Sequence, residues 1–253
     1  MPQDTATQSL FLTTIFAAPF VGCFAATAVR AHISGESAFW GRSRCGHCQY
    51  KLAIWDLIPI FSWLANYGRC RHCSSRVSIL YPYMESTFVV ITLIVVNQND
   101  SIESFIMGII LGWALITLCA FDIAAFVLPN IITYALIYIG VGVAFLQGTE
   151  AGFESVAGGC AGAIFLIAVK YAYLRMRGRD GLGMGDVKLF AAAGAWVGID
   201  GLPQVLLLGS LLGLLHATVI ARNSQDISSE RIPFGVGLSI GFGATWLYGS
   251  LLP

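Results

Sequence analysis

Long apolar segments alternate with short polar segments along most of this chain of 253 residues. A helix needs about 20 apolar residues to cross the hydrocarbon core of a bilayer. Windows of roughly that kind fall at 9–29, 79–97, 104–122, 130–147, 155–174, 182–199, 202–221 and 234–252. The sixth is the weakest, because its uninterrupted apolar run extends only from Val187 to Ile199. The pattern predicts an all-α polytopic membrane protein with about eight transmembrane helices.

The composition supports a lipid environment. Hydrophobic residues make up 57% of the chain and charged residues only 11%, whereas soluble domains carry about 25% charge. So few charges cannot cover a soluble surface, and disorder would require low hydrophobicity with high net charge. Lys plus Arg and Asp plus Glu both number 14, so we expect the bilayer as a partner and no nucleic acid.

The basic residues predict the orientation of these spans. With eight spans, all 14 Lys and Arg residues fall on one side, together with eight acidic residues, and the other side has six acidic residues. Cytoplasmic loops carry the excess of basic residues, so this side is predicted to be cytoplasmic and both termini to lie outside. The predicted domains are a first transmembrane helix at 1–30, a cytoplasmic loop domain at 31–78 and a seven-helix membrane domain at 79–253.

The predicted loop domain contains two C-x-x-C pairs separated by 21 residues. They consist of Cys45 with Cys48 and of Cys70 with Cys73. Four thiolates at this spacing suit one tetrahedral structural Zn²⁺, whereas a reducing cytoplasm disfavours disulfides. The aromatic-rich stretch 50–67 between the pairs lies at the membrane interface or forms the core of a small zinc domain.

Several ionisable residues fall within predicted spans, where charge is costly and usually serves a function. They are Glu85, Asp122, Asp186, Lys188 and His216. At a rise of about 1.5 Å per residue, Asp122 and Asp186 both fall in the cytoplasmic half of the membrane.

Two carboxylates close together in a low dielectric share one proton, since both cannot ionise. The ionised carboxylate then takes a proton from water, and the protonated one polarises a peptide carbonyl. Gly183 and Gly185, just before Asp186, permit backbone conformations and close approaches closed to other residues. In the alternative interpretation, each Asp caps a helix or pairs with a base such as Lys188.

These motifs resemble the type 4 prepilin peptidases, bacterial membrane members of the GxGD aspartyl proteases. The resemblance covers nearly the whole chain. It rests on the cysteine loop, IPIFSW at 58–63, YPYME at 81–85, Asp122 with LP at 128–129, GLGMGDVKL at 181–189 and PFG at 233–235. The sequence departs from the family pattern at Asn130, where Asp is common, and at Val236, where Pro is usual.

The resemblance implies cleavage of the basic leader of prepilins or pseudopilins, after a glycine, at the cytoplasmic face of the inner membrane. Such substrates belong to type IV pili or type II secretion. Methylation of the new N-terminus with S-adenosylmethionine is also implied. Asp122 and Asp186 would be the catalytic dyad, and the four loop cysteines the zinc ligands. We expect Gly183, Gly185, Lys188 and Glu85 to support the substrate or the surrounding loops.

Two other functions compete with this prediction. Residues 237–241 fit G-x-S-x-G, so a rhomboid-like serine protease would use Ser239 with His216. However, in hydrolases the G-x-S-x-G motif forms a turn between a strand and a helix, and residues 237–241 are predicted to be helical throughout. The other candidate is a multi-span transporter or proton-relay channel with a cytoplasmic zinc domain, because buried acids serve proton relays.

Overall fold

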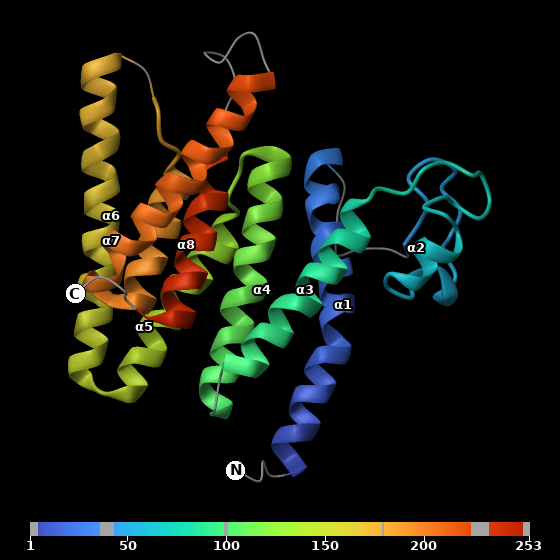
Figure 1. Ribbon diagram of the computed structural model, residues 1–253, viewed down its shortest axis with the longest axis horizontal. Helices are drawn as coiled ribbons and strands as arrows, with labels where there is room; N and C mark the ends of the chain where they lie inside the picture. Colours follow the sequence, from blue (N-terminus) through green and yellow to red (C-terminus); the bar gives the residue numbers. More distant parts are fainter. Residues whose placement is uncertain (1–4, 36–42, 99–100, 179, 224–232, 250–253) are drawn as a thin grey trace. The chain divides into compact units, whose positions relative to one another are not determined.

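The computed structural model describes residues 5–35, 43–98, 101–178, 180–223 and 233–249 (Figure 1). Within these ranges the ordered elements are helices, apart from two isolated β-bridges. The chain forms two compact units, Met1–Thr117 and Leu118–Pro253, which divide inside the third long helix. Helix α3 packs against α1 within the first unit.

The first unit contains three long helices and a small loop region. Its elements are α1 (Thr5–Ser34), η1 (Ile54–Leu57), α2 (Phe61–Ala65), α3 (Leu80–Gln98) and the first part of α4 (Ile102–Ala125). Helices α1 and α3 touch at Gly22, where an added Cβ would lie 2.8 Å from the carbonyl oxygen of Met84. Trp113 of α4 donates a hydrogen bond of 3.0 Å to the Thr92 hydroxyl of α3. Glycine and polar side chains thus bring these membrane helices together, as is usual in lipid.

The loop between α1 and α3 is built from two similar turns. Each turn carries one C-x-x-C pair and is closed by one antiparallel bridge, Arg44 with Lys51 in the first turn and Arg69 with Arg76 in the second. Backbone hydrogen bonds of 2.9 and 2.8 Å close the turns just inside the bridges. The repeated geometry places the two cysteine pairs at equivalent points.

The second unit contains the end of α4 and the remaining helices. They are α5 (Asn130–Gln147), α6 (Thr149–Arg177), α7 (Met184–Asn223) and α8 (Phe234–Tyr248). Gly198 interrupts α7 with φ 72° and ψ −178°, a left-handed φ that favours glycine. Phe190 and Leu202, on either side of this break, both lie against Gly162 of α6. A straight helix would separate them by about 18 Å, so α7 folds back at Gly198 into two arms (Figure 1).

Glycines also bring the helices of the second unit into backbone contact. Gly158 of α6 meets Gly194 of the first arm of α7, where neither position has room for a Cβ. An added Cβ on Gly237 of α8 would lie 2.5 Å from the Gly209 carbonyl oxygen in the second arm of α7. These residues belong to the small-xxx-small pairs of the sequence, which allow helix backbones to approach closely in bilayers.

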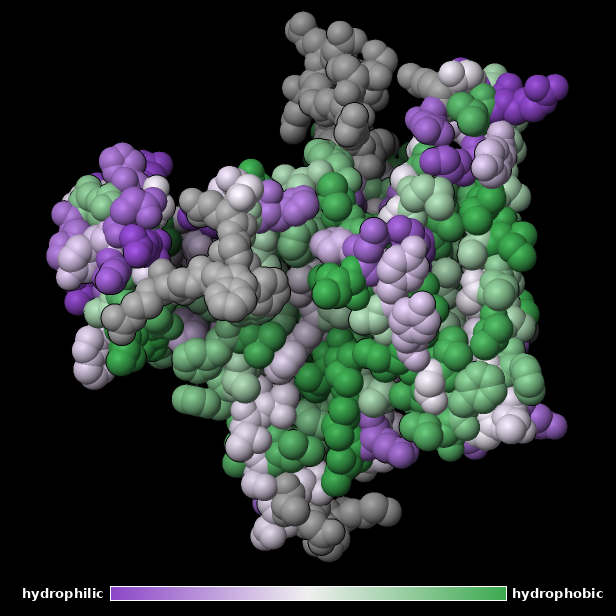
Figure 2. Space-filling model, turned by 180° about the vertical axis from the view of Figure 1, so that it is seen from behind, coloured by the Kyte–Doolittle hydropathy of each residue, from purple (hydrophilic) through white to green (hydrophobic). Residues whose placement is uncertain are grey.

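The hydrophobic surface agrees with the predicted membrane location. Within the described ranges, six helices are long and apolar enough to cross a bilayer, namely α1, α3, α4, α5, α6 and α7. Since α7 has two arms and α8 is a further apolar helix of 15 residues, the apolar segments follow the order of the predicted windows. Figure 2 shows hydrophobic residues along the helices and hydrophilic residues at helix ends and over the cysteine loop. The predicted all-α polytopic membrane fold is confirmed.

Candidate active site and metal centre

Asp122 lies in the last turn of α4 and is buried, with 6% of its surface exposed. Its Oδ2 atom accepts a hydrogen bond of 3.0 Å from the backbone N–H of Val236. The Gly235 amide also donates to this carboxylate. Both amides belong to the first turn of α8, where backbone N–H groups have no partner within the helix. Asp122 is therefore held by the N-terminus of a helix more than 100 residues away in the sequence.

Asp186 lies in the first turn of α7 and is half-buried. The backbone N–H of Gly183 donates to its carboxylate. Gly183 directly precedes α7 and Asp186 is the third residue of this helix, so the side chain of Asp186 reaches back to the N-cap, as in one half of a capping box. An added Cβ on Gly183 would lie 3.2 Å from Asp186 Oδ2, so glycine permits this close approach. Both aspartates therefore lie at helix N-termini, Asp122 at that of α8 and Asp186 at that of α7, as the helix-capping alternative expects.

The structure brings the surroundings of the two aspartates together at Leu128. An added Cβ on Gly185, next to Asp186, would lie 3.0 Å from the buried Leu128 side chain. An added Cβ on Gly235 would lie 2.8 Å from Asp122 Oδ2 and 3.1 Å from Leu128 Cδ1. The α4–α5 connection thus fills the space between the start of α7 and the start of α8. Two acids that share a proton in such a site have the chemistry of an aspartyl protease.

Lys188 is not an ion-pair partner of either aspartate among the residues that the structure describes. Its Nζ donates a hydrogen bond of 2.7 Å to Asn130 Oδ1 and lies 4.9 Å from the centre of the Tyr134 ring. Lys188 therefore joins the first arm of α7 to the first turns of α5. Lys188 is thus engaged by Asn130 and not by a salt bridge to either aspartate.

Glu85 makes its contacts within the first unit. Its side chain is buried, and Oε2 accepts a hydrogen bond of 2.6 Å from the backbone N–H of Ile60. Ile60 has a φ of 63°, which is unusual for a β-branched residue. The Glu85 carboxylate therefore fixes the loop backbone where it enters α2 in an otherwise unfavourable conformation, a contact of the loop-supporting kind expected for this residue.

The four loop cysteines form one cluster. The Sγ atoms of Cys45, Cys48, Cys70 and Cys73 all lie within 4.8 Å of one another, and none is in a disulfide. The Cys45 and Cys73 sulfurs are 3.8 Å apart, as expected for two ligands of one tetrahedral Zn²⁺, since Zn–S bonds of about 2.3 Å put the sulfurs about 3.8 Å apart. Backbone N–H groups of Cys48 and His47 lower the pKa of the Cys45 thiol to about 6. The cluster fits a zinc ion.

The residues of the predicted serine site are not brought together. Ser239 of α8 is 2% exposed, whereas His216 is exposed on the second arm of α7. Within the described ranges no hydrogen bond joins them, and the buried Ser239 hydroxyl has no hydrogen-bond partner. The segment 237–241 is helical, so the elbow geometry is absent there.

The sequence did not predict the two backbone N–H groups that donate to Asp122, nor the hydrogen bond from Lys188 to Asn130. The Val236 and Gly235 amides reach Asp122 because α8 begins directly after Pro233. That proline was a usable signal, since proline often marks a helix start and the next amides are free. No local signal pairs Lys188 with Asn130, which is 58 residues away.

The fold and the site define a polytopic membrane protein with two acids at one end of a helical unit. Two family models match the chain, the Bacterial Peptidase A24 N-terminal domain over residues 15–98 and the Type IV leader peptidase family over residues 109–218. The second match includes both Asp122 and Asp186, and the first includes all four cysteines. No solved structure matches the chain.

Curated relatives agree with the family models. A prepilin leader peptidase/N-methyltransferase of Burkholderia pseudomallei (strain 1026b) is 33% identical over 210 residues, which cover 83% of this chain and 68% of the relative. Proteins of the same name from Aeromonas hydrophila and Pseudomonas putida are 34% and 32% identical, and the matches cover 81% of this chain and 70% of each relative. The chain belongs to the type IV leader peptidase family.

Proposed function

We propose that this chain is a membrane aspartyl endopeptidase that removes the basic leader of type IV prepilins and pseudopilins, cutting after a glycine. The observation that carries the proposal is geometric: Gly185, next to Asp186, and Gly235, which contacts Asp122, both lie against Leu128 at one end of the second unit. The relatives named prepilin leader peptidase/N-methyltransferase supply the substrate class. Prepilins and pseudopilins are therefore the proposed protein partners.

The proposed chemistry follows from the surroundings of the two acids. Asp122 is buried and held by two amides, while Asp186 is half-buried and capped by one. With one proton shared between them, the ionised acid takes a proton from the attacking water and the protonated acid donates toward the scissile carbonyl oxygen. The glycine at 183 leaves room beside Asp186 for an extended substrate backbone.

The charges at the ends of the second unit support cleavage on the cytoplasmic side. Lys170, Arg175, Arg177 and Lys188 lie at the end where α6 finishes and α7 begins, near the two aspartates. The opposite end, at the start of α6 and the α7 break, carries acids. Basic residues mark the cytoplasmic side, so the site would open to the cytoplasm at the inner membrane and both termini would lie outside. Of the other basic residues, Arg42, Arg179 and Arg231 lie outside the described residues.

Methylation of the new N-terminus, with S-adenosylmethionine as donor, is the second proposed activity. It is supported by the N-methyltransferase in the names of the relatives. Within the described ranges the β-structure consists of two isolated bridges, so a strand–loop–helix nucleotide site is not found there. No residue is assigned to the methyl donor.

Zinc is the proposed structural cofactor of the cysteine loop. The four sulfurs fit one tetrahedral ion, and the loop has little apolar core of its own, since Trp55 and Tyr67 are 69% and 88% exposed. A metal would therefore supply the folding energy that this small region lacks, as structural zinc does elsewhere.

Mass spectrometry of a prepilin that is co-expressed with this chain tests the proposed function. We expect a product that begins directly after the leader glycine, with one methyl group on the new amine. A prepilin that keeps its leader while the protein is present and folded in the membrane would refute the peptidase. A cleaved product without the methyl group would refute only the methyltransferase.

Variants of the candidate site separate the protease classes in the same assay. Asp122→Asn and Asp186→Asn are each expected to leave the leader in place, because each removes one member of the acid pair. Ser239→Ala is the matched control from the serine alternative and is expected to process the prepilin normally. Loss of cleavage in the serine variant alone would favour the serine protease.

A further inference from the structure

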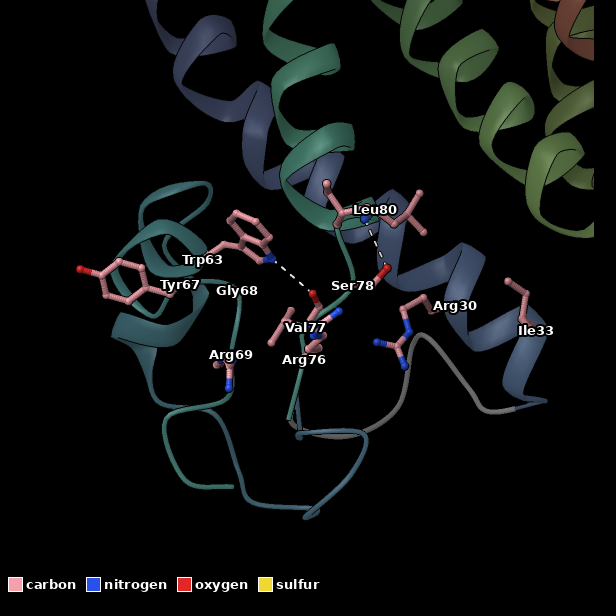
Figure 3. A pocket seen from close by; sticks show the side chains of 11 residues that line it. Arg30, Ile33, Trp63, Tyr67, Gly68, Arg69, Arg76, Val77, Ser78 and Leu80 are labelled. Carbon is pink, nitrogen blue, oxygen red and sulfur yellow. Dashed lines mark hydrogen bonds between the residues drawn. The ribbon is translucent and has the colours of Figure 1, made fainter. Parts of the chain in front are cut away.

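A cavity of about 780 Å³ lies in the first unit, between the end of α1, the second cysteine turn and the start of α3. Three arginines line it, Arg30 from α1 and Arg69 and Arg76 from the turn. Figure 3 shows the Arg30 guanidinium reaching from α1 toward the segment that carries Arg76. We call this cavity the arginine pocket.

The charge in the arginine pocket is not balanced by the described part of the chain. Arg69 and Arg76 face each other across an antiparallel bridge, where like charges repel. None of the three arginines forms an ion pair with a described residue, whereas the nearby Arg71 pairs with Asp56 at 3.2 Å. Three arginines that line one cavity favour an anion that accepts several hydrogen bonds, as phosphate does.

A hydroxyl group in the arginine pocket is also available to an anion. The Ser78 oxygen accepts a hydrogen bond of 3.2 Å from the backbone N–H of Leu80. Its O–H can therefore still donate, since a hydroxyl is both donor and acceptor. Figure 3 shows Ser78 between the arginine-bearing turn and the start of α3.

The rim of the arginine pocket is apolar. Ile33 of α1 is 59% exposed, Tyr67 is 88% exposed and Ile79, just before α3, is 72% exposed. Ile33 and Ile79 lie at the ends of two helices, α1 and α3, that are apolar enough to cross a bilayer. A soluble phosphate would leave them uncovered in water, whereas a lipid would bring acyl chains to them.

We propose that the arginine pocket binds the phosphate headgroup of an anionic phospholipid, with the acyl chains against the apolar rim. Basic clusters directly beside membrane helices attract anionic lipids in this way. The bound lipid would link the cysteine loop to the ends of α1 and α3 at the membrane surface. The proposal does not depend on the peptidase activity, because the experiment that tests it measures lipid binding alone.

Native mass spectrometry of the full protein, released from nanodiscs with equal amounts of phosphatidylglycerol and phosphatidylcholine, tests the proposal. We expect the wild type to retain phosphatidylglycerol preferentially. Arg69→Gln/Arg76→Gln and, separately, Arg30→Gln are expected to weaken this retention at least tenfold. Thermal unfolding of each variant establishes that it is folded.

The chain offers a matched control in its other cysteine turn. Arg44→Gln/Lys51→Gln removes the same charge from an equivalent bridge that does not line the pocket, so we expect retention within twofold of the wild type. An equal loss in this control, or equal retention of both lipids by the wild type, would overturn the proposal. Displacement of the lipid by millimolar glycerol 3-phosphate would overturn it too, because the ligand would then be a soluble phosphate.

Discussion

Gly235 lies against the carboxylate of Asp122, and its substitution by alanine tests whether that carboxylate must stay in place. An added Cβ would lie 2.8 Å from Asp122 Oδ2, 3.1 Å from Cγ and 3.1 Å from Leu128 Cδ1. Ordinary contacts of this kind begin near 3.4 Å, so the new methyl group and the carboxylate must separate by about 0.6 Å. The carboxylate cannot rotate away without losing its hydrogen bond from Val236.

A misplacement of about 1 Å in a reacting group costs on the order of 10²-fold in rate. We therefore expect Gly235→Ala to lower kcat for leader removal by about 10- to 100-fold with little change in KM. The assay is the rate of leader removal from a prepilin by the purified protein in lipid vesicles. Overpacking costs about 1–3 kcal/mol of stability, so thermal unfolding is measured in parallel.

Gly142→Ala is the matched control, because an added Cβ at this helical position of α5 meets nothing within 4 Å. It should keep the wild-type rate. A Gly235→Ala protein that is folded and cleaves at the wild-type rate would refute the proposed role of the Asp122 position.

Two further predictions concern the cysteine loop of the first unit. The wild type should contain one zinc per chain by metal analysis, Cys45→Ser/Cys70→Ser should contain none, and Cys160→Ser should be unchanged; an unaltered metal content in the double variant would contradict the cluster. Glu85→Ala leaves the backbone N–H of Ile60 without an acceptor, at a cost of about 1–3 kcal/mol, so limited proteolysis of the loop should be faster. Glu85→Gln keeps an acceptor and should resist proteolysis like the wild type.

The helices of this fold could be predicted from hydropathy because lipid-facing positions must be apolar. The window at 130–147 coincides with α5, and the gap between the windows at 182–199 and 202–221 lies close to the left-handed Gly198. Helix ends were predicted less well. The window at 155–174 is shorter than α6, because the polar first turn and the basic last turn of this helix lie beyond its apolar part.

The candidate site could be predicted from sequence only in part. The position of Asp122 near the end of α4 and of Asp186 near the start of α7 follows from counting residues along their spans, and the cysteine spacing implies the cluster. The bond from Val236 to Asp122 could not be predicted, because it joins segments 114 residues apart and depends on how α8 packs. The arginine pocket could not be predicted either, because the antiparallel bridge between Arg69 and Arg76 and the end of α1 bring its three arginines to one cavity.

The central claim is that Asp122 and Asp186 act as one catalytic pair. Its most direct test is the rate of leader removal by purified Asp122→Asn, Asp186→Asn and the double variant in identical vesicles. Residues that act as a unit are not additive, so each single variant should lose about 10²- to 10⁴-fold and the double variant should lose no more. A wild-type rate in either single variant, or losses that multiply in the double variant, would contradict the claim.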